Sequence, residues 1–141
     1  MLTRDVNLMI RRNDMGRVIR IAGECGFRFR GKADAAGVDM LLYGDSGSAK
    51  NALHLLFSGE RVRPGQATPN PEISPVQKTV HGEPVAVISL ADLLRMKLSS
   101  WRLKDQVHVQ VMDAAGLITR QVESTLSEEL QARLQHVRDT E

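Results

Sequence analysis

The chain has 141 residues, of which 42% are apolar and 26% charged, and its formal net charge is +2. This length is sufficient for one globular domain with its own core, so we expect a single domain over residues 1–141. No apolar run approaches the roughly 20 residues of a membrane-spanning helix. The N-terminus lacks the apolar block of a signal peptide, and the single cysteine, Cys25, excludes an internal disulfide. These features predict a cytoplasmic protein with no membrane partner.

Charge is unevenly distributed along the chain. Basic side chains crowd the first 32 residues, whereas acidic side chains gather in the last third. A basic surface can face the phosphates of a nucleotide or of RNA, but an ordinary solvated surface has the same composition. No aromatic residues alternate with the basic ones to stack bases, so RNA is a candidate partner without a supporting feature.

The first predicted strand carries two polar side chains two positions apart. Asp5 and Asn7 lie in the run LTRDVNLMIRR, and residues i and i+2 of a strand project from the same face. Oxygen-bearing side chains placed in this way suggest ligands for a hard cation such as Mg²⁺. The same alternation is also typical of a strand with one solvated face. The pair by itself leaves both interpretations open.

The following residues predict a helix and a short strand. Asn13 or Asp14 can cap a helix over 15–25, in which apolar residues recur at spacings of three and four up to Cys25. This spacing places Cys25 on the apolar side, where we expect a small buried side chain. Gly26 is positioned to end the helix, and alternating Phe and Arg residues predict a strand that ends at Gly31.

Further strands are expected over 37–44, where Asp39 is the only charge, and over 52–60, with a turn at 45–51 between them. The proline-rich stretch 63–75 predicts an extended loop, followed by a strand ending at Val80, a turn, and a strand through Val85 and Ile88. Ser89 with Asp92 three residues later predicts a helix start.

The last helix is expected over about 125–139, begun by Thr125 with Glu128 three positions on. Strands mixed with helices, and connections too short for a crossover, predict an α+β (mixed α/β) domain. We expect the strands over 5–10 and 37–43 to be neighbours in one mixed sheet, flanked by helices over 15–25 and 90–101.

A polar cluster follows the apolar stripe of the 90–101 helix. Lys97 falls on the apolar face, where a lysine must extend to solvent, pair with a carboxylate or serve a pocket. Together with Arg102, Lys104 and Asp105 it suggests a structured polar site. The alternative is that Asp105 pairs with Arg102 or Arg95 for structure alone.

Three stretches, TRDVNLMI, GVDMLLYG and VISLADLLRMKLSSWRLKDQVHV, together resemble the nucleotidyltransferase-like proteins, which include the toxins of some bacterial toxin–antitoxin systems. The resemblance implies that Asp5 and Asn7 match the first pair of metal ligands and that Asp39 supplies a third. It also implies a helix across 107–111, where alternating valines suggest a strand instead, and we follow the resemblance. The matching residues of the distal helix are Leu90, Leu93, Met96, Lys97, Leu98, Arg102, Lys104 and Asp105.

The sequence departs from that family at positions that matter for chemistry. Relatives have, before the first metal-binding strand, a helix opened by Gly-Gly or Gly-Ser that holds a triphosphate, and Met1 stands only four residues before Asp5. Asn7 offers a neutral oxygen where a carboxylate is expected, and His108 stands where relatives often have Asp. Phosphoryl transfer relies on carboxylates to hold Mg²⁺, so this ion is expected to bind weakly or not at all.

These departures predict a degenerate nucleotidyltransferase-like domain that acts as a binding or interaction module. Its expected partners are a nucleotide, a partner protein or a second copy of the chain, since an exposed first strand can pair with another strand.

The alternative is a Mg²⁺-dependent transferase that moves a nucleoside monophosphate from a nucleoside triphosphate to an RNA, a protein or a small molecule. In it, Asp5, Asn7 and Asp39 hold the metal, while Asp5 and Asp39 act in catalysis with Lys97. The nucleotide is then held by Arg102, Lys104 and Asp105.

Overall fold

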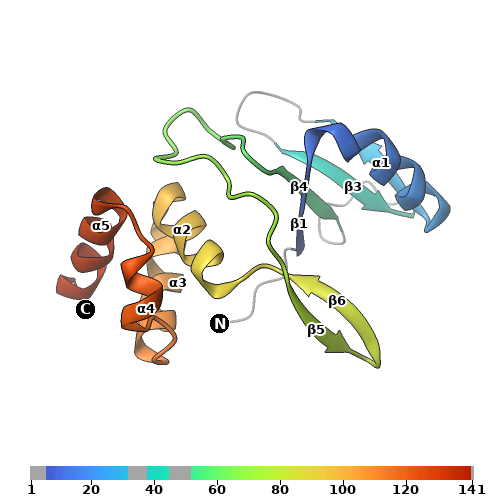
Figure 1. Ribbon diagram of the computed structural model, residues 1–141. Coiled ribbons are helices and arrows are strands. Elements are labelled where there is room, and N and C mark those ends of the chain that lie inside the picture. Colours follow the sequence, from blue (N-terminus) through green and yellow to red (C-terminus); the bar gives the residue numbers. More distant parts are fainter. Residues whose placement is uncertain (1–5, 32–37, 45–51, 141) are drawn as a thin grey trace. The chain divides into compact units, whose positions relative to one another are not determined.

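The computed structural model describes residues 6–31, 38–44 and 52–140 (Figure 1). These residues form helices and two separate sheets, which confirms the α+β prediction. The chain divides into two compact units, Met1–Pro64 and Gly65–Glu141, which are described in turn. Within the described ranges, no helix has the length and apolar character needed to cross a membrane.

The first unit is a four-stranded sheet with one long helix. Its strands and helix are β1 (Val6–Ile10), α1 (Met15–Glu24), β2 (Phe27–Arg30), β3 (Asp39–Tyr43) and β4 (Leu53–Phe57), with a 3-10 turn at Arg12–Asp14. The strand order is β1-β4-β3-β2, with β1 parallel to β4 and the other pairs antiparallel.

The prediction that the first strand and the 37–43 strand are neighbours is wrong, because β4 lies between β1 and β3. Strands β3 and β4 are close in sequence and pair antiparallel, which a short connection allows. Strand β1 then joins the other side of β4 in a parallel pair, which the long connection through α1, β2 and β3 allows.

Helix α1 covers one face of this sheet. Its apolar stripe, Met15, Val18, Ile19 and Ala22, packs against a buried cluster formed by Leu41, Leu55 and Phe57, as the 3–4 spacing predicts. Gly26, at φ +90°, ends the helical turn in a conformation that favours glycine. Cys25 follows the last helical residue and is exposed, so the prediction that it is a buried side chain is wrong.

The second unit begins with an extended segment and a hairpin. Strands β5 (Val76–Val80) and β6 (Glu83–Val87) pair antiparallel in a separate two-stranded sheet. The two turn residues, His81 and Gly82, have φ values of +50° and +80°. Positive φ at both positions is typical of two-residue hairpin turns whose twist matches that of the flanking strands. The predicted strand–turn–strand pattern is confirmed.

Four helices complete this unit: α2 (Leu90–Ser100), α3 (Leu103–Ala114), α4 (Arg120–Ser124) and α5 (Glu128–Asp139). Ser89 caps α2, with its Oγ accepting the Asp92 backbone N–H at 3.2 Å, as predicted. The implied helix over 107–111 is confirmed, because Val109 is buried whereas Val107 and Val111 are exposed.

The last helix begins at Glu128 with Ser127 as its cap, and not at Thr125. Thr125 instead follows the short helix α4 and donates its hydroxyl to the Val122 carbonyl at 2.6 Å. The core of this unit is made by leucines of α2 and α5, with contributions from α3 and the α4 region: Leu94, Leu98, Val109, Met112, Ile118, Leu126, Leu130, Leu134 and Val137.

Replacing Leu134 by Ala should lower the free energy of unfolding by about 2–5 kcal/mol, because it leaves a cavity around a fully buried side chain. Leu103→Ala is the matched control, since Leu103 is 81% exposed and its truncation should change stability by less than about 0.5 kcal/mol. Urea denaturation followed by circular dichroism measures both. Equal effects of the two substitutions would contradict this packing.

Candidate functional site

Of the predicted metal ligands, Asn7 and Asp39 do not share a face of the sheet. Asn7 pairs with His54, which in turn pairs with Met40, so these three side chains project from one side. Asp39 pairs with Leu55, which is also the partner of Leu8 on β1, and this row projects from the side covered by α1. A shift of one residue along a strand reverses the face.

The predicted convergence of Asn7 and Asp39 is therefore wrong. The first member of the predicted set, Asp5, lies outside the described residues. In the part of the chain that the structure describes, no three His, Cys, Asp or Glu side chains are grouped so that they could hold a metal ion.

The surroundings of Asp39 contain a guanidinium. Arg12 makes a two-bond ion pair with Glu60, with Nε–Oε2 and Nη2–Oε1 distances of 3.1 and 2.7 Å. Its guanidinium carbon also lies 3.5 Å from the centre of the Phe57 ring. The hydrogen bonds with Glu60 raise the pKa of Arg12 despite partial burial, and the charges of Glu60 and Asp39 act in the same direction. Arg12 therefore supplies positive charge close to Asp39.

The predicted cluster at the α2–α3 corner is assembled around Asp105. This carboxylate is 1% exposed and accepts from Lys97 Nζ at 3.3 Å and from Arg102 Nε at 2.7 Å. The Arg102 backbone N–H, at 3.3 Å, adds a helix cap. Arg95 pairs with Asp92 and not with Asp105. Lys104 is exposed on the first turn of α3.

These partners hold Asp105 in its ionised form. Burial alone would raise the pKa of Asp105, but the hydrogen bonds from Arg102 and Ser100 and the positive charges of Arg102 and Lys97 outweigh it and lower the pKa. The chain reverses direction beside it through Trp101, which adopts a left-handed φ of +58°. Of the two interpretations of this cluster, the contacts favour the structural one, in which Asp105 joins the two helices.

The neighbouring His108 is affected by the same cluster. Burial is the main cause that lowers the pKa of His108, and the positive charges of Lys97, Lys104 and Arg102 add to it against the opposing charge of Asp105. These effects favour the neutral form of the imidazole over the charged form.

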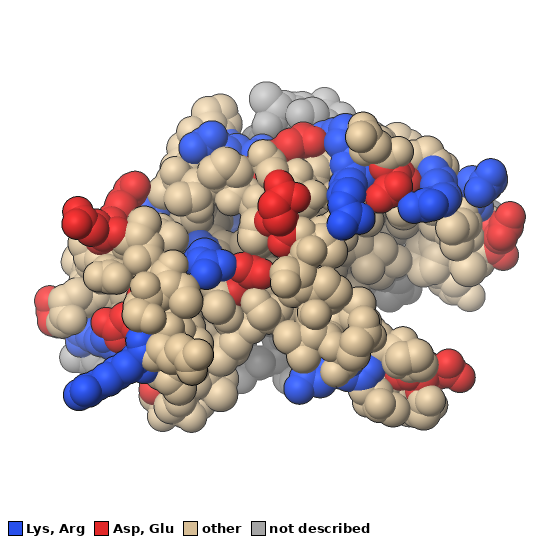
Figure 2. Space-filling model, in the orientation of Figure 1, with Lys and Arg blue, Asp and Glu red and all other residues tan. Residues whose placement is uncertain are grey.

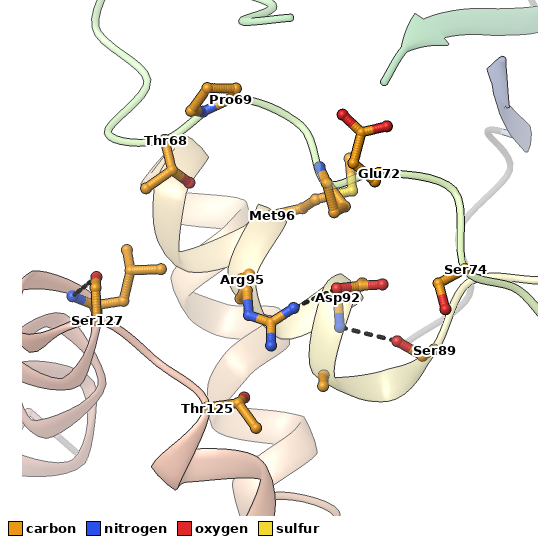
Figure 3. Close-up of a pocket in the computed structure, with 13 residues that line it drawn as sticks. Thr68, Pro69, Glu72, Ser74, Ser89, Asp92, Arg95, Met96, Thr125 and Ser127 are labelled. Carbon is orange, nitrogen blue, oxygen red and sulfur yellow. Dashed lines mark hydrogen bonds and ion pairs between the residues drawn. The ribbon is translucent and has the colours of Figure 1, made fainter. Parts of the chain in front are cut away.

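A pocket of about 670 Å³ lies elsewhere in the second unit (Figure 3). Its walls come from the extended segment 68–74, the start and middle of α2, the end of α4 and the start of α5. They are Thr68, Pro69, Pro71, Glu72, Ser74, Ser89, Ala91, Asp92, Arg95, Met96, Thr125, Ser127 and Leu130. The sequence does not predict this site, because the segment 63–75 indicates only an extended loop.

An ion pair between Asp92 and Arg95 forms part of the lining of the pocket. Arg95 Nη1 bonds to Asp92 Oδ1 within one turn of α2, and Figure 3 shows the guanidinium extending from α2 toward Asp92. The Asp92 side chain is 11% exposed and that of Arg95 is 34% exposed. The extended segment is tied down beside them, because the Thr68 backbone N–H donates to Ser99 Oγ at 2.8 Å. Among the residues that line the pocket, the sequence pattern that predicts structure is the Ser-x-x-Asp cap of α2.

Comparison of the chain with protein-family models, with curated proteins and with solved structures found no match.

Replacing Asp105 by Asn should destabilise the protein by about 1.5–3 kcal/mol near pH 7, because the charge-assisted hydrogen bonds from Lys97 and Arg102 to a buried carboxylate are weakened. The folded-state pKa of Asp105 lies below its ordinary value, so the stabilisation is present above about pH 4 and is lost as the pH falls through the folded pKa. Urea denaturation near pH 7 and near pH 3 should therefore show a difference between wild type and variant that shrinks at the lower pH.

The control for that experiment is Asp139→Asn, since Asp139 is exposed and receives one hydrogen bond, from Gln135 at 2.8 Å. It should change stability by less than about 0.5 kcal/mol at either pH. An effect of Asp105→Asn that is as large near pH 3 as near pH 7 would contradict the role of the carboxylate charge.

Proposed function

We propose that this chain is a nucleotidyltransferase-like interaction module that associates with a second copy of itself through strand β1. The observation that supports it is the position of β1 at the edge of the four-stranded sheet. Loss of transferase chemistry is supported by the register, since Asn7 and Asp39 project from opposite faces and cannot bind one Mg²⁺ together.

Strand β1 is hydrogen-bonded along one side among the described residues, where it pairs with β4. The Ser58 N–H donates to the Ile10 carbonyl at 2.9 Å, on the same side as β4. Backbone groups alternate in direction along a strand, so Leu8 and Val6 also face β4. The N–H and C=O groups of Asn7 and Met9 therefore face away from β4, where they can pair with another strand.

The two edge strands of this sheet differ in how well their side chains hinder pairing with a further strand. The opposite edge, β2, carries Arg28 and Arg30, both exposed, and charged side chains on an edge hinder pairing with a further strand. Strand β1 has the sequence VNLMI, with neither a charge nor a proline. Its edge is thus the one that permits strand addition.

A second copy of the chain can pair with the outward N–H and C=O groups of Asn7 and Met9 without any further structural element. Two β1 strands related by a twofold axis run antiparallel, and each then bonds the outward groups of the other. The same strand serves on both sides of the interface, so no further partner is required. Basic and acidic side chains are interspersed on the face seen in Figure 2, which supports a protein partner over a nucleic acid.

Asn7→Pro should abolish this association, because proline removes an outward N–H while leaving the ladder with β4 intact. Size-exclusion chromatography with light scattering, over a range of concentrations, should show dimer for wild type and monomer for the variant. Asn7→Ala is the matched control and should still dimerise. Leu8→Pro should unfold the sheet unit, because the Leu8 backbone faces β4.

A monomeric wild-type chain at all concentrations would contradict the proposal. A dimer that persists in Asn7→Pro, with circular dichroism unchanged, would place the interface elsewhere.

Asn7→Asp should not produce nucleotidyl transfer, because a carboxylate at this position still faces away from Asp39. The assay incubates wild type and variant with labelled nucleoside triphosphates, Mg²⁺ or Mn²⁺, and bulk tRNA or cell lysate. Labelling of an acceptor above the no-protein control, lost on Asp5→Ala, would contradict this prediction and favour the Mg²⁺-dependent transferase.

A further inference from the structure

We infer that the pocket lined by Asp92 and Arg95 binds a neutral, polyhydroxylated ring, such as a sugar or the ribose of a nucleoside. The inference depends on the second unit alone and is independent of association through β1. Its volume, about 670 Å³, is in the range typical of small-molecule sites.

The charges of the lining residues disfavour an anion. Asp92 and Glu72 are acidic, Arg95 is the single cation among the lining residues, and its charge is already paired with Asp92. The helices α2 and α5 both begin at the pocket, but acidic residues in their first turns, Asp92 in α2 and Glu128 and Glu129 in α5, offset the positive end of each helix dipole. A phosphate would therefore meet more negative than positive charge.

The Asp92–Arg95 pair leaves an acceptor and donors next to each other. Arg95 bonds to Oδ1 of Asp92, and Oδ2 has no partner among the described residues. No fully buried side-chain polar atom in the described part of the chain lacks a partner, so Oδ2 keeps accessible surface, and Asp92 is one of the residues that line the pocket. Arg95 bonds Asp92 through Nη1 and keeps Nε and Nη2 available as donors.

This arrangement matches the chemistry of a hydroxyl group. A hydroxyl both donates and accepts, so one ring hydroxyl can donate to Asp92 Oδ2 while accepting from Arg95. A second hydroxyl on the adjacent carbon can use the remaining guanidinium N–H. A carbonyl oxygen or an unprotonated phosphate oxygen only accepts and would leave the carboxylate without a donor.

Serine hydroxyls add further donors to the lining of the pocket. Ser89 and Ser127 each accept a backbone N–H, from Asp92 at 3.2 Å and from Leu130 at 3.3 Å, and each keeps its own O–H to donate. Figure 3 shows Ser74 and Ser89 on the Asp92 side of the pocket.

The remaining walls are apolar. Pro69, Pro71, Ala91, Met96 and Leu130 provide hydrocarbon surface against which the C–H face of a sugar ring can pack. A ring with hydroxyls at its edge and C–H groups on its face uses both kinds of lining.

The test is titration of the ¹⁵N-labelled full chain with D-ribose, with D-glucose and with inorganic phosphate, followed by NMR. Ribose or glucose should produce saturable shifts in the amides of residues 89–96 and 127–130, and phosphate should not. Asp92→Asn should weaken this binding at least about tenfold, the loss expected for a charge-assisted hydrogen bond. Asp139→Asn, a carboxylate outside the pocket, should bind as wild type does.

Ser127→Gly is a second variant that keeps the fold, because glycine is tolerated at a helix N-cap, and it should weaken binding about threefold or more by removing one hydroxyl. The absence of saturable shifts with both sugars would overturn the inference. So would saturable shifts with phosphate alone, which would identify an anion site, or binding unaffected by both Asp92→Asn and Ser127→Gly.

Discussion

Strand β4 lies between β1 and β3 and hydrogen-bonds to both, and this ladder fixes the direction of every side chain on the three strands. Leu8, Leu55 and Asp39 share one row, and Asn7, His54 and Met40 share the next. The first of these rows lies on the face covered by α1, where Leu55 is buried. The face that Asn7 occupies is thus determined by the need to bury Leu8 and its neighbours.

The helical unit depends on a comparable constraint at the α2–α3 corner. Asp105 is buried and is bonded by Lys97 and Arg102, so its charge is compensated by groups from both sides of the turn. A buried carboxylate without such partners would be strongly destabilising. These side chains are engaged in joining two helices, whereas Asp92 and Arg95, nearer the start of α2, line the pocket.

Local features of this fold were predictable from the sequence, and features that depend on distant residues were not. The stripe of α1, the hairpin around Gly82 and the Ser89 cap each follow from residues within a few positions of one another. The strand order depends on which partner β1 finds across some 45 residues, and no spacing rule encodes that choice. The sequence leaves three options for Lys97, of which pairing with a carboxylate is one, and only tertiary contacts identify Asp105 as the partner.

Other differences have equally specific causes. Cys25 continues the spacing of three and four residues of the apolar stripe of α1. The helix ends at Glu24, however, so this spacing does not place Cys25 on the buried face, and the side chain is exposed. Thr125 and Ser127 both fit a helix cap, and the presence of α4 determines which one is used. The pocket combines three segments separated in sequence, and its ion pair could not be recognised as part of a cavity before the extended segment 68–74 was placed beside α2.

The register of the sheet is tested most directly by nuclear Overhauser effects between side chains of the labelled chain. The structure predicts contacts from His54 to both Asn7 and Met40, and contacts from Leu55 to Leu8, with Asp39 in the Leu55 row. Contacts between the side chains of Asn7 and Asp39 would contradict this register. They would place the two oxygen ligands on one face and return the sheet to the metal-binding arrangement.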